Sequence, residues 1–193
     1  MKKAEPAEVI PPKKIIIGDK NAPITLVEYG DYESEACGAA NVVVEQLLER
    51  YAGQIKFIFR HFPLLKFHQR AHKAAEAAIG AAQEGKFWEM HKELFANRRN
   101  LGVISLKSHA REAGVASKSF LNDLINGIYG IYVQDDLKEG MKLGVVDIPT
   151  FFLNGKKIEG EPTLKNLDNH IRALISPAKA KTAKIGQLEE KIA

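Results

Sequence analysis

Short apolar runs and helical periodicities alternate along the first third of the chain. Residues 24–29 form a short run rich in β-branched and aromatic side chains, which predicts a buried strand. Apolar residues then recur at helical spacing over residues 37–51 and predict a helix. Residues 55–61 alternate and place aromatic side chains and a histidine on one face of a second strand. The pattern therefore predicts a β-α-β unit.

Helical periodicity dominates the middle of the chain. Residues 69–84 are rich in alanine, and such a helix can pack closely against a neighbour. Residues 87–95 repeat apolar side chains at i, i+3 and i+4 and predict a second amphipathic helix. Ser105 and Ser117 are predicted N-caps of two further helices, and a last helix is expected to end at Leu143.

Strand signals return near the C-terminal end. Residues 150–153 and 156–159 flank Asn154-Gly155, a dipeptide that favours a tight hairpin. A closing helix is expected over residues 163–175. Residues 177–193 are rich in alanine and lysine and are predicted to form a tail. The whole order predicts an α/β fold in which one small sheet is split by a helical insertion.

Composition and charge narrow the class of protein. A chain of 193 residues with 45% hydrophobic and 27% charged residues is typical of one soluble globular domain with an insertion. No apolar run approaches the roughly 20 residues that span a bilayer, so no integral membrane segment is expected. The net charge of +4 comes from residues 1–14 and 177–193, which carry +2 each. The neutral body between them argues against a nucleic-acid partner.

Cysteine and histidine content excludes the common metal and disulfide architectures. Cys37 is the only cysteine, so neither a disulfide framework nor a zinc site with several thiolates is possible. His68 and His72 lie four residues apart, but no third ligand follows at a convincing spacing. We therefore expect solvated or capping histidines and no metal.

The segment around Cys37 has the composition of a reactive site. A strand ends, a short turn follows, and Ser34 and Cys37 stand three residues apart at the start of the predicted helix. Unpaired backbone N–H groups at a helix N-terminus stabilise an anion and can lower the pKa of a thiol there. A residue deeper in the helix gains less from this effect, so Ser34 is the more exposed position of the two.

A second segment, residues 148–155, begins a strand at a proline. Proline has no backbone N–H to donate to a sheet, so Pro149 is expected at an irregular strand start. We predict a cis peptide bond between Ile148 and Pro149.

Four stretches together resemble the DsbA family of thioredoxin-fold thiol–disulfide oxidoreductases. They are residues 28–38, the Phe-Arg-His-Phe-Pro-Leu run at 59–64, Gly-Lys-Phe-Trp-Glu-Met-His at 85–91, and Ile-Pro-Thr-Phe-Phe-Leu-Asn-Gly at 148–155. They follow the family order, and the resemblance covers residues 15–176. It implies a thioredoxin-like fold with a helical subdomain inserted between the two halves of the sheet.

The resemblance also implies a division of the chain into parts. A flexible N-terminal segment is expected over residues 1–20, and the first half of the thioredoxin-like domain over 21–62. The helical insertion is expected over 63–143, the second half of the domain over 144–176, and a basic C-terminal tail over 177–193.

The family's functional residues carry over to five positions. Glu28 matches the acid that assists proton transfer, and Cys37 matches the resolving cysteine. Pro149 matches the cis-proline, and with Ile148 it would form the edge that binds substrate peptide. Ser34 stands where the family has its nucleophilic cysteine. The predicted site is therefore Glu28, Ser34 and Cys37 for chemistry, with Ile148 and Pro149 for substrate.

The serine is a departure that bears directly on activity. A protonated hydroxyl cannot replace a thiolate in thiol exchange, and Ser34 and Cys37 cannot form a disulfide. Glu35 and Ala36 replace the intervening residues as well, and Glu35 would disfavour a nearby thiolate by charge repulsion. Asp147 stands where relatives commonly have glycine. The pattern favours natural divergence and impaired oxidoreductase activity.

Three functions remain open from the sequence. The first is an oxidoreductase-like protein with an incomplete Ser-x-x-Cys pair that binds extended polypeptide or a redox partner as a monomer, without a cofactor. The second resembles kappa-class glutathione transferases or isomerases, with Ser34 bonded to the glutathione thiolate. The third is a non-catalytic peptide-binding or chaperone module. No signal peptide is predicted in this chain; the family is commonly periplasmic or otherwise extracytoplasmic, and a cytoplasmic location stays open.

Overall fold

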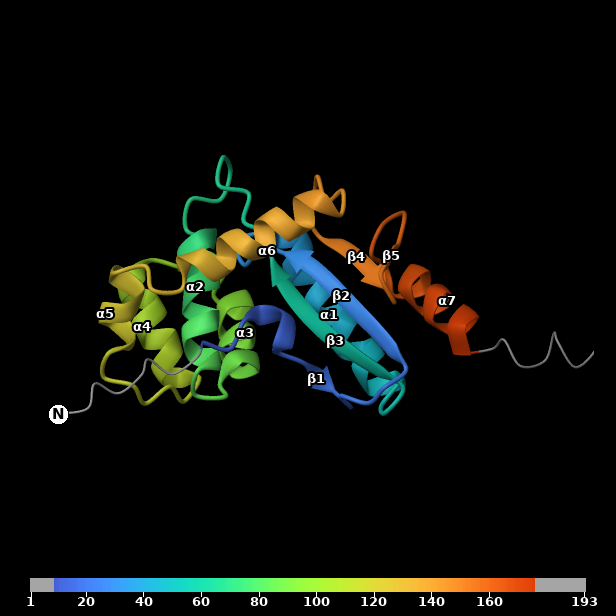
Figure 1. Ribbon diagram of the computed structural model, residues 1–193, viewed down its shortest axis with the longest axis horizontal. Coiled ribbons are helices and arrows are strands. Elements are labelled where there is room, and N and C mark those ends of the chain that lie inside the picture. The colour runs from blue at the N-terminus through green and yellow to red at the C-terminus, as the bar shows by residue number, and fades with distance from the viewer. Residues whose placement is uncertain (1–8, 176–193) are drawn as a thin grey trace, which may run out of the picture.

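The computed structural model describes residues 9–175 (Figure 1). The predicted tail over 177–193 and the first eight residues of the predicted N-terminal segment lie outside the described residues. Within residues 9–175, none of the helices combines the length and the apolar character needed to cross a membrane.

A mixed sheet of five strands forms the centre of the thioredoxin-like part, in the order β1-β3-β2-β4-β5. The strands are β1 (Ile17–Gly18), β2 (Ile24–Gly30), β3 (Ile55–His61), β4 (Thr150–Leu153) and β5 (Lys156–Lys157). The two long strands β2 and β3 are parallel, and β4 joins β2 antiparallel. Because β4 comes from the far end of the sequence, the two halves of the chain meet in one sheet, as predicted.

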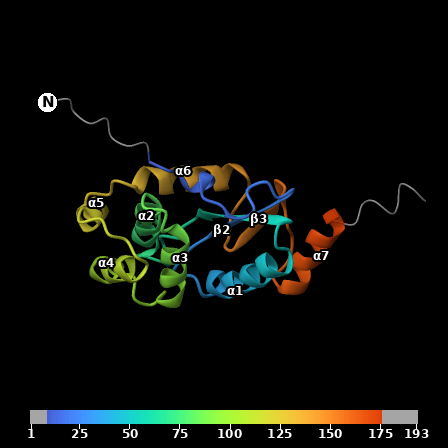
Figure 2. The same cartoon turned by 90° about the horizontal axis from the view of Figure 1, so that it is seen from below.

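Helices cover both faces of this sheet. Helix α1 (Glu35–Arg50) connects the parallel strands β2 and β3, and α7 (Leu164–Ile175) packs beside it. Figure 2 shows α1 and α7 on one face of the sheet and α6 (Gly130–Lys142) on the other. The sheet is therefore the middle layer of a three-layer arrangement.

The helical insertion lies between β3 and β4 in the chain and forms one end of the molecule (Figure 1). It contains α2 (Ala71–Ala82), α3 (Phe87–Ala96), α4 (Val103–Glu112), α5 (Phe120–Ile125) and α6. Helix α2 is its centre, since ten of its twelve residues are buried. A Cβ atom at Gly80 would lie 3.0 Å from Tyr129 and 3.1 Å from Phe120, so small residues allow this close packing.

Buried charges join the insertion to the sheet. Arg60 on β3 donates through Nε to Asp136 Oδ1 of α6 at 2.7 Å and contacts Glu139 Oε2 at 2.8 Å. Asp136 also accepts from the backbone N–H of His61 at 2.9 Å. These bonds fix α6 across the end of β3, which is the strand beside the candidate site.

The N-terminal segment differs from the prediction. Residues 1–20 are predicted as a flexible segment, but within it Pro12–Lys14 form a 3-10 turn and β1 pairs with β3. Ile15 and Ile17 pack against the main core. Gly18 has φ +92, and a Cβ there would lie 2.7 Å from the backbone oxygen of Ile55. A strand of two residues gives no periodic signal, so the sequence did not predict it.

The two predicted serine N-caps are also wrong. Helix α4 begins after Gly102, and the Ser105 hydroxyl bonds Asn100 Oδ1 instead. Helix α5 begins after Ser119, and Ser117 Oγ accepts from the Ser119 backbone N–H in the preceding turn. A serine in the first turn of a helix resembles a cap in sequence, and only the backbone geometry separates the two roles.

The hairpin at Asn154-Gly155 is confirmed. Both residues have positive φ, at 48° and 79°, as a two-residue hairpin turn requires. The second strand of the hairpin is shorter than predicted and spans only Lys156–Lys157.

Candidate functional site

Ser34 and Cys37 lie at the N-terminus of α1, one short turn after β2. Ser34 is the N-cap residue, and its Oγ accepts a hydrogen bond from the Cys37 backbone N–H at 3.2 Å. Ser34 is 6% exposed and Cys37 is 0% exposed, so the serine is the outer residue of the pair, as predicted. The structure thus uses the Ser34 side chain to complete the helix end.

The Cys37 thiol is held in its protonated form. Burial raises its pKa most, and the nearby carboxyl group of Glu28 raises it further. The hydrogen bonds to Ser34 and to the Asp31 backbone oppose this rise only in part. A helix N-terminus favours a thiolate, but the loss of hydration outweighs that effect at this depth.

Glu28 lies on β2, beneath the start of α1. It is 1% exposed, and its Oε1 atom has no hydrogen-bond partner among the described residues. Burial raises its pKa well above the usual range, because the ionised carboxylate would lose its hydration there. A Cβ atom at Gly30 would lie 2.9 Å from this Oε1 atom and 2.6 Å from the Phe59 ring. The glycine therefore makes room for the carboxyl group.

The Ile148-Pro149 bond is cis, which confirms the prediction. Thr150 follows it and pairs with Tyr29 near the end of β2. Since Ser34 follows the end of β2 after a short turn, Pro149 and the start of α1 lie at the same end of the sheet. The structure thus brings the predicted site residues to one edge of the thioredoxin-like part.

Asp147 bonds the backbone N–H of the residue that precedes the cis-proline. Its Oδ1 accepts from the Ile148 backbone N–H at 2.8 Å, and its carbonyl oxygen accepts from Thr150 Oγ1 at 2.7 Å. Pairing with an extended polypeptide uses backbone donors of this kind. The side chain of Asp147 must therefore turn away before the Ile148 N–H can serve a ligand.

Sequence reasoning missed Asp31, which organises the loops around the site. Its carboxylate accepts from the Leu64 backbone N–H at 3.0 Å and from His68 Nδ1 at 2.8 Å. Its other oxygen accepts from the Glu33 backbone N–H at 2.8 Å. Asp31 therefore fixes the turn before α1 to the loop after β3. An aspartate directly after a predicted strand is the only sequence signal for this role.

His68, His72 and His91 each bond to a neighbouring side chain. His68 bonds Asp31, whereas His72 bonds Glu76 Oε1 at 3.0 Å, so the two do not face a shared ligand. Among residues 9–175, no group of three or more metal-ligating side chains comes together. His91 accepts from the Tyr32 hydroxyl at 3.0 Å, and burial lowers its pKa to about 3.

Glu35, the residue after Ser34, points away from the protein. Its side chain is 83% exposed and lies 3.5 Å from Arg98 Nη2. The arginine offsets part of the negative charge that the sequence places beside the pair. The repulsion expected from Glu35 is therefore weaker than the sequence alone suggests.

Comparison with known proteins agrees with this fold. A protein-family model described as Thioredoxin matches residues 11–173, and the chain belongs to this family. Within it, the structural matches are to DsbA-like thiol–disulfide oxidoreductases. Oxidised BdbD from Bacillus subtilis superposes with a TM-score of 0.75 at 23% identity, over 84% of this chain and 91% of that chain. For alpha-DsbA1 from Wolbachia pipientis the TM-score is 0.72 at 25% identity, over 86% and 93%.

Curated relatives match the chain over a segment of much longer proteins. The Na(+)/H(+) antiporter NhaA 1 of Mycobacterium sp. (strain KMS) is 36% identical over 154 residues, which are 79% of this chain and 25% of that protein. NhaA 1 of Salinispora arenicola is 34% identical over 159 residues, 82% of this chain and 24% of that protein. The chain therefore spans about a quarter of the length of these relatives.

Proposed function

We propose that this chain binds extended polypeptide at the edge beside Ile148 and Pro149, without turning over disulfides. One observation carries the proposal. Ser34 serves as the N-cap of α1, while the only thiol, Cys37, has no exposed surface. The chain thus has the scaffold of a DsbA-like oxidoreductase and lacks an accessible nucleophile.

The chemistry of thiol–disulfide exchange explains why we expect no disulfide turnover. A thiolate must attack one sulfur of a disulfide, and the second sulfur leaves as a new thiolate. Ser34 carries a protonated hydroxyl, and Cys37 is buried with a raised pKa. Neither group supplies an attacking thiolate near neutral pH. We therefore expect insulin reduction and dithiol oxidation at background rates.

At the edge beside Ile148 and Pro149, a bound peptide would have to displace a side chain. The Ile148 N–H is bonded to Asp147 Oδ1, so a peptide must compete with a side chain that is already in place. One neutral or charge-assisted hydrogen bond contributes about 0.5–3 kcal/mol. Asp147 is therefore expected to weaken peptide binding relative to a chain with a smaller residue there.

The test is the affinity for a fluorescein-labelled, cysteine-free peptide with no stable fold, measured by anisotropy. Asp147→Ala frees the Ile148 N–H and is expected to tighten binding about threefold to tenfold. The matched control is Asp135→Ala, an exposed aspartate on α6, which should bind as the wild type does. Cys37→Ala should also leave the affinity unchanged. Absence of peptide binding in both the wild type and Asp147→Ala would overturn the proposal.

A glutathione-dependent function is the second candidate, because one feature of Ser34 favours it. Its Oγ accepts a bond from the Cys37 backbone N–H, and the hydroxyl lies at the start of α1 beside the Cys37 thiol, whose pKa it lowers. A hydroxyl donor at a helix N-terminus suits a bound thiolate. Calorimetry with glutathione decides between the two functions: submillimolar binding that Ser34→Ala abolishes would favour the transferase, and no heat of binding would remove it.

Antiport is not proposed for this chain. The curated relatives that carry that name are about four times as long as the segment that matches this chain, and the match is confined to that segment.

A further inference from the structure

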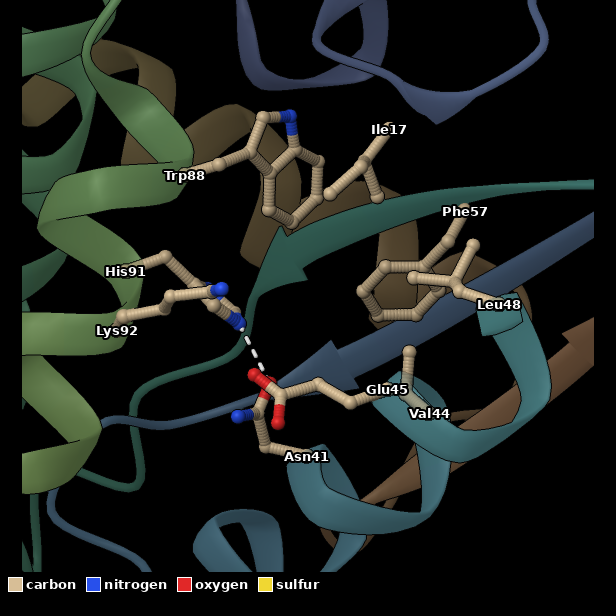
Figure 3. A pocket seen from close by; sticks show the side chains of 9 residues that line it. All are labelled: Ile17, Asn41, Val44, Glu45, Leu48, Phe57, Trp88, His91 and Lys92. Carbon is tan, nitrogen blue, oxygen red and sulfur yellow. Dashed lines mark hydrogen bonds between the residues drawn. The ribbon is translucent and has the colours of Figure 1, made fainter. Parts of the chain in front are cut away.

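A cavity of about 310 Å³ opens between α1 and α3, and neither Ser34 nor Cys37 is among the residues that line it (Figure 3). It is built from the thioredoxin-like part and the helical insertion together, with β1 as a third wall. Its lining residues are Ile17, Asn41, Val44, Glu45, Leu48, Phe57, Trp88, His91 and Lys92. The volume lies at the lower end of the range for small-molecule sites.

One part of the cavity is apolar. Phe57 of β3 and Trp88 of α3 form an aromatic corner, with ring centroids 5.8 Å apart and planes at 43°. Ile17 and Leu48 continue the apolar surface, and Figure 3 shows these four side chains gathered on one side of the cavity. An aliphatic or aromatic group of a ligand would be removed from water there.

The opposite side carries two charges of opposite sign, one from each helix. Figure 3 shows Glu45 of α1 and Lys92 of α3 extending toward each other beside the hydrogen bond from His91 Nε2 to Asn41 Oδ1, which is 2.9 Å long. Neither Glu45 nor Lys92 forms an ion pair or a side-chain hydrogen bond within the described part of the chain. His91 is neutral because burial lowers its pKa to about 3. The charges available to a ligand are therefore one carboxylate and one ammonium.

We propose that this cavity binds a small zwitterion with an apolar body, of the chemical class of an apolar α-amino acid. The ligand's ammonium group would contact Glu45, its carboxylate would contact Lys92, and its side chain would lie in the aromatic corner at Phe57 and Trp88. An amine or a carboxylate alone uses only one of the two charges. The site involves neither Ser34 nor Pro149, so it is independent of the proposed peptide edge.

Trp88 makes the site directly observable, because it is the only tryptophan of the chain. The experiment is a titration of tryptophan fluorescence in the intact protein with L-leucine, which does not itself fluoresce. Isopentylamine and 4-methylpentanoate, which keep only the amine or only the carboxylate, are the comparison probes. L-Leucine should give a saturable change, and each comparison probe should bind about tenfold more weakly.

Two charge variants separate the contacts without touching the core. Glu45→Gln should weaken L-leucine and isopentylamine about tenfold and leave 4-methylpentanoate unchanged. Lys92→Gln should weaken L-leucine and 4-methylpentanoate and leave isopentylamine unchanged. Glu49→Gln and Lys107→Gln change exposed residues outside the cavity and serve as controls.

The outcomes decide the proposal in either direction. Selective loss in the two variants, with both controls at wild-type affinity, supports a zwitterion site. Three results would each overturn it: no saturable change with L-leucine, equal affinity for all three probes, or the same response in Glu45→Gln and Lys92→Gln as in the controls.

Discussion

Glu28 on β2 and Arg60 on the neighbouring strand β3 are both buried ionisable side chains. They differ in whether a partner of opposite charge lies beside them. On β2, the Glu28 carboxyl group is buried without a partner for Oε1, and its pKa is raised. On β3, Arg60 is buried against Asp136, and its hydrogen bonds to the exposed Glu139 hold the pKa of that carboxyl group below its usual value. Burial without a partner therefore raises the pKa of an acid, and a bonded cation opposes that rise.

The difference matches the location of each group. The paired charges join α6 to the sheet, where a fixed and fully bonded cluster orients the insertion. The unpaired Glu28 lies beneath Ser34 and Cys37, where a neutral acid can hold or release a proton. The first group serves architecture, and the second has the properties of a site.

The largest expected effect comes from breaking the paired cluster. Asp136→Ala leaves the buried Arg60 and the His61 backbone N–H without their main acceptor. We expect the free energy of unfolding to fall by roughly 3–5 kcal/mol. Urea denaturation at pH 7 measures it, and Asp135→Ala, an exposed neighbour on the same helix, is expected to change it by less than about 0.5 kcal/mol. Similar losses in both variants would show that the cluster does not retain α6.

The unpaired acid should respond in the opposite direction. The folded pKa of Glu28 is raised, so the unfolded chain releases this proton first as pH rises, and the wild type loses stability above the ordinary carboxyl range. Glu28→Gln removes that loss. The variant should gain stability relative to the wild type by about 1.4 kcal/mol per pH unit until the folded pKa is reached.

Urea unfolding at pH 4 and pH 7 tests the Glu28 prediction. The two proteins should be close in stability at the lower pH and differ at the higher one. Glu49→Gln, at an exposed position on α1, should follow the wild type at both pH values. A difference between Glu28→Gln and the wild type that does not change with pH would contradict a raised pKa.

The smallest expected effect is a shift in the pKa of a thiol introduced at position 34. This variant also tests the comparison of β2 with β3 most closely. Ser34→Cys places a sulfur at the helix N-terminus, outside the buried Cys37, and the two cysteines would stand three positions apart in one turn. The N-terminal N–H groups should lower the pKa of the new thiol by about one unit. We expect an internal disulfide under mild oxidant and measurable insulin reduction.

A second variant that also changes Glu35 provides the comparison for that experiment. Ser34→Cys with Glu35→Gln should have a thiol pKa a few tenths lower than Ser34→Cys alone, because the Glu35 charge is exposed and partly offset by Arg98. Thiolate ultraviolet absorbance against pH gives both values. If Ser34→Cys forms no disulfide with Cys37, the scaffold has lost more than its first cysteine.

The sequence by itself determined the elements whose signals are local. The strands at residues 24–29 and 55–61, the Asn154-Gly155 hairpin and the irregular strand start at Pro149 each depend on a few adjacent residues. The match of four motifs in order then determined the topology. Periodicity and turn chemistry are properties of short segments, so they can be recognised before the fold is known.

Only the tertiary structure decided the state of the chemical groups. The short strand β1, the contact of Asp31 with His68, and the bond from Ile148 to Asp147 had no periodic signal. The raised pKa values of Glu28 and Cys37 depend on burial by segments far away in the chain, including Phe151 opposite Glu28. Hydration and charge pairing are set by neighbours in space, and the order of residues alone does not give the distance between them.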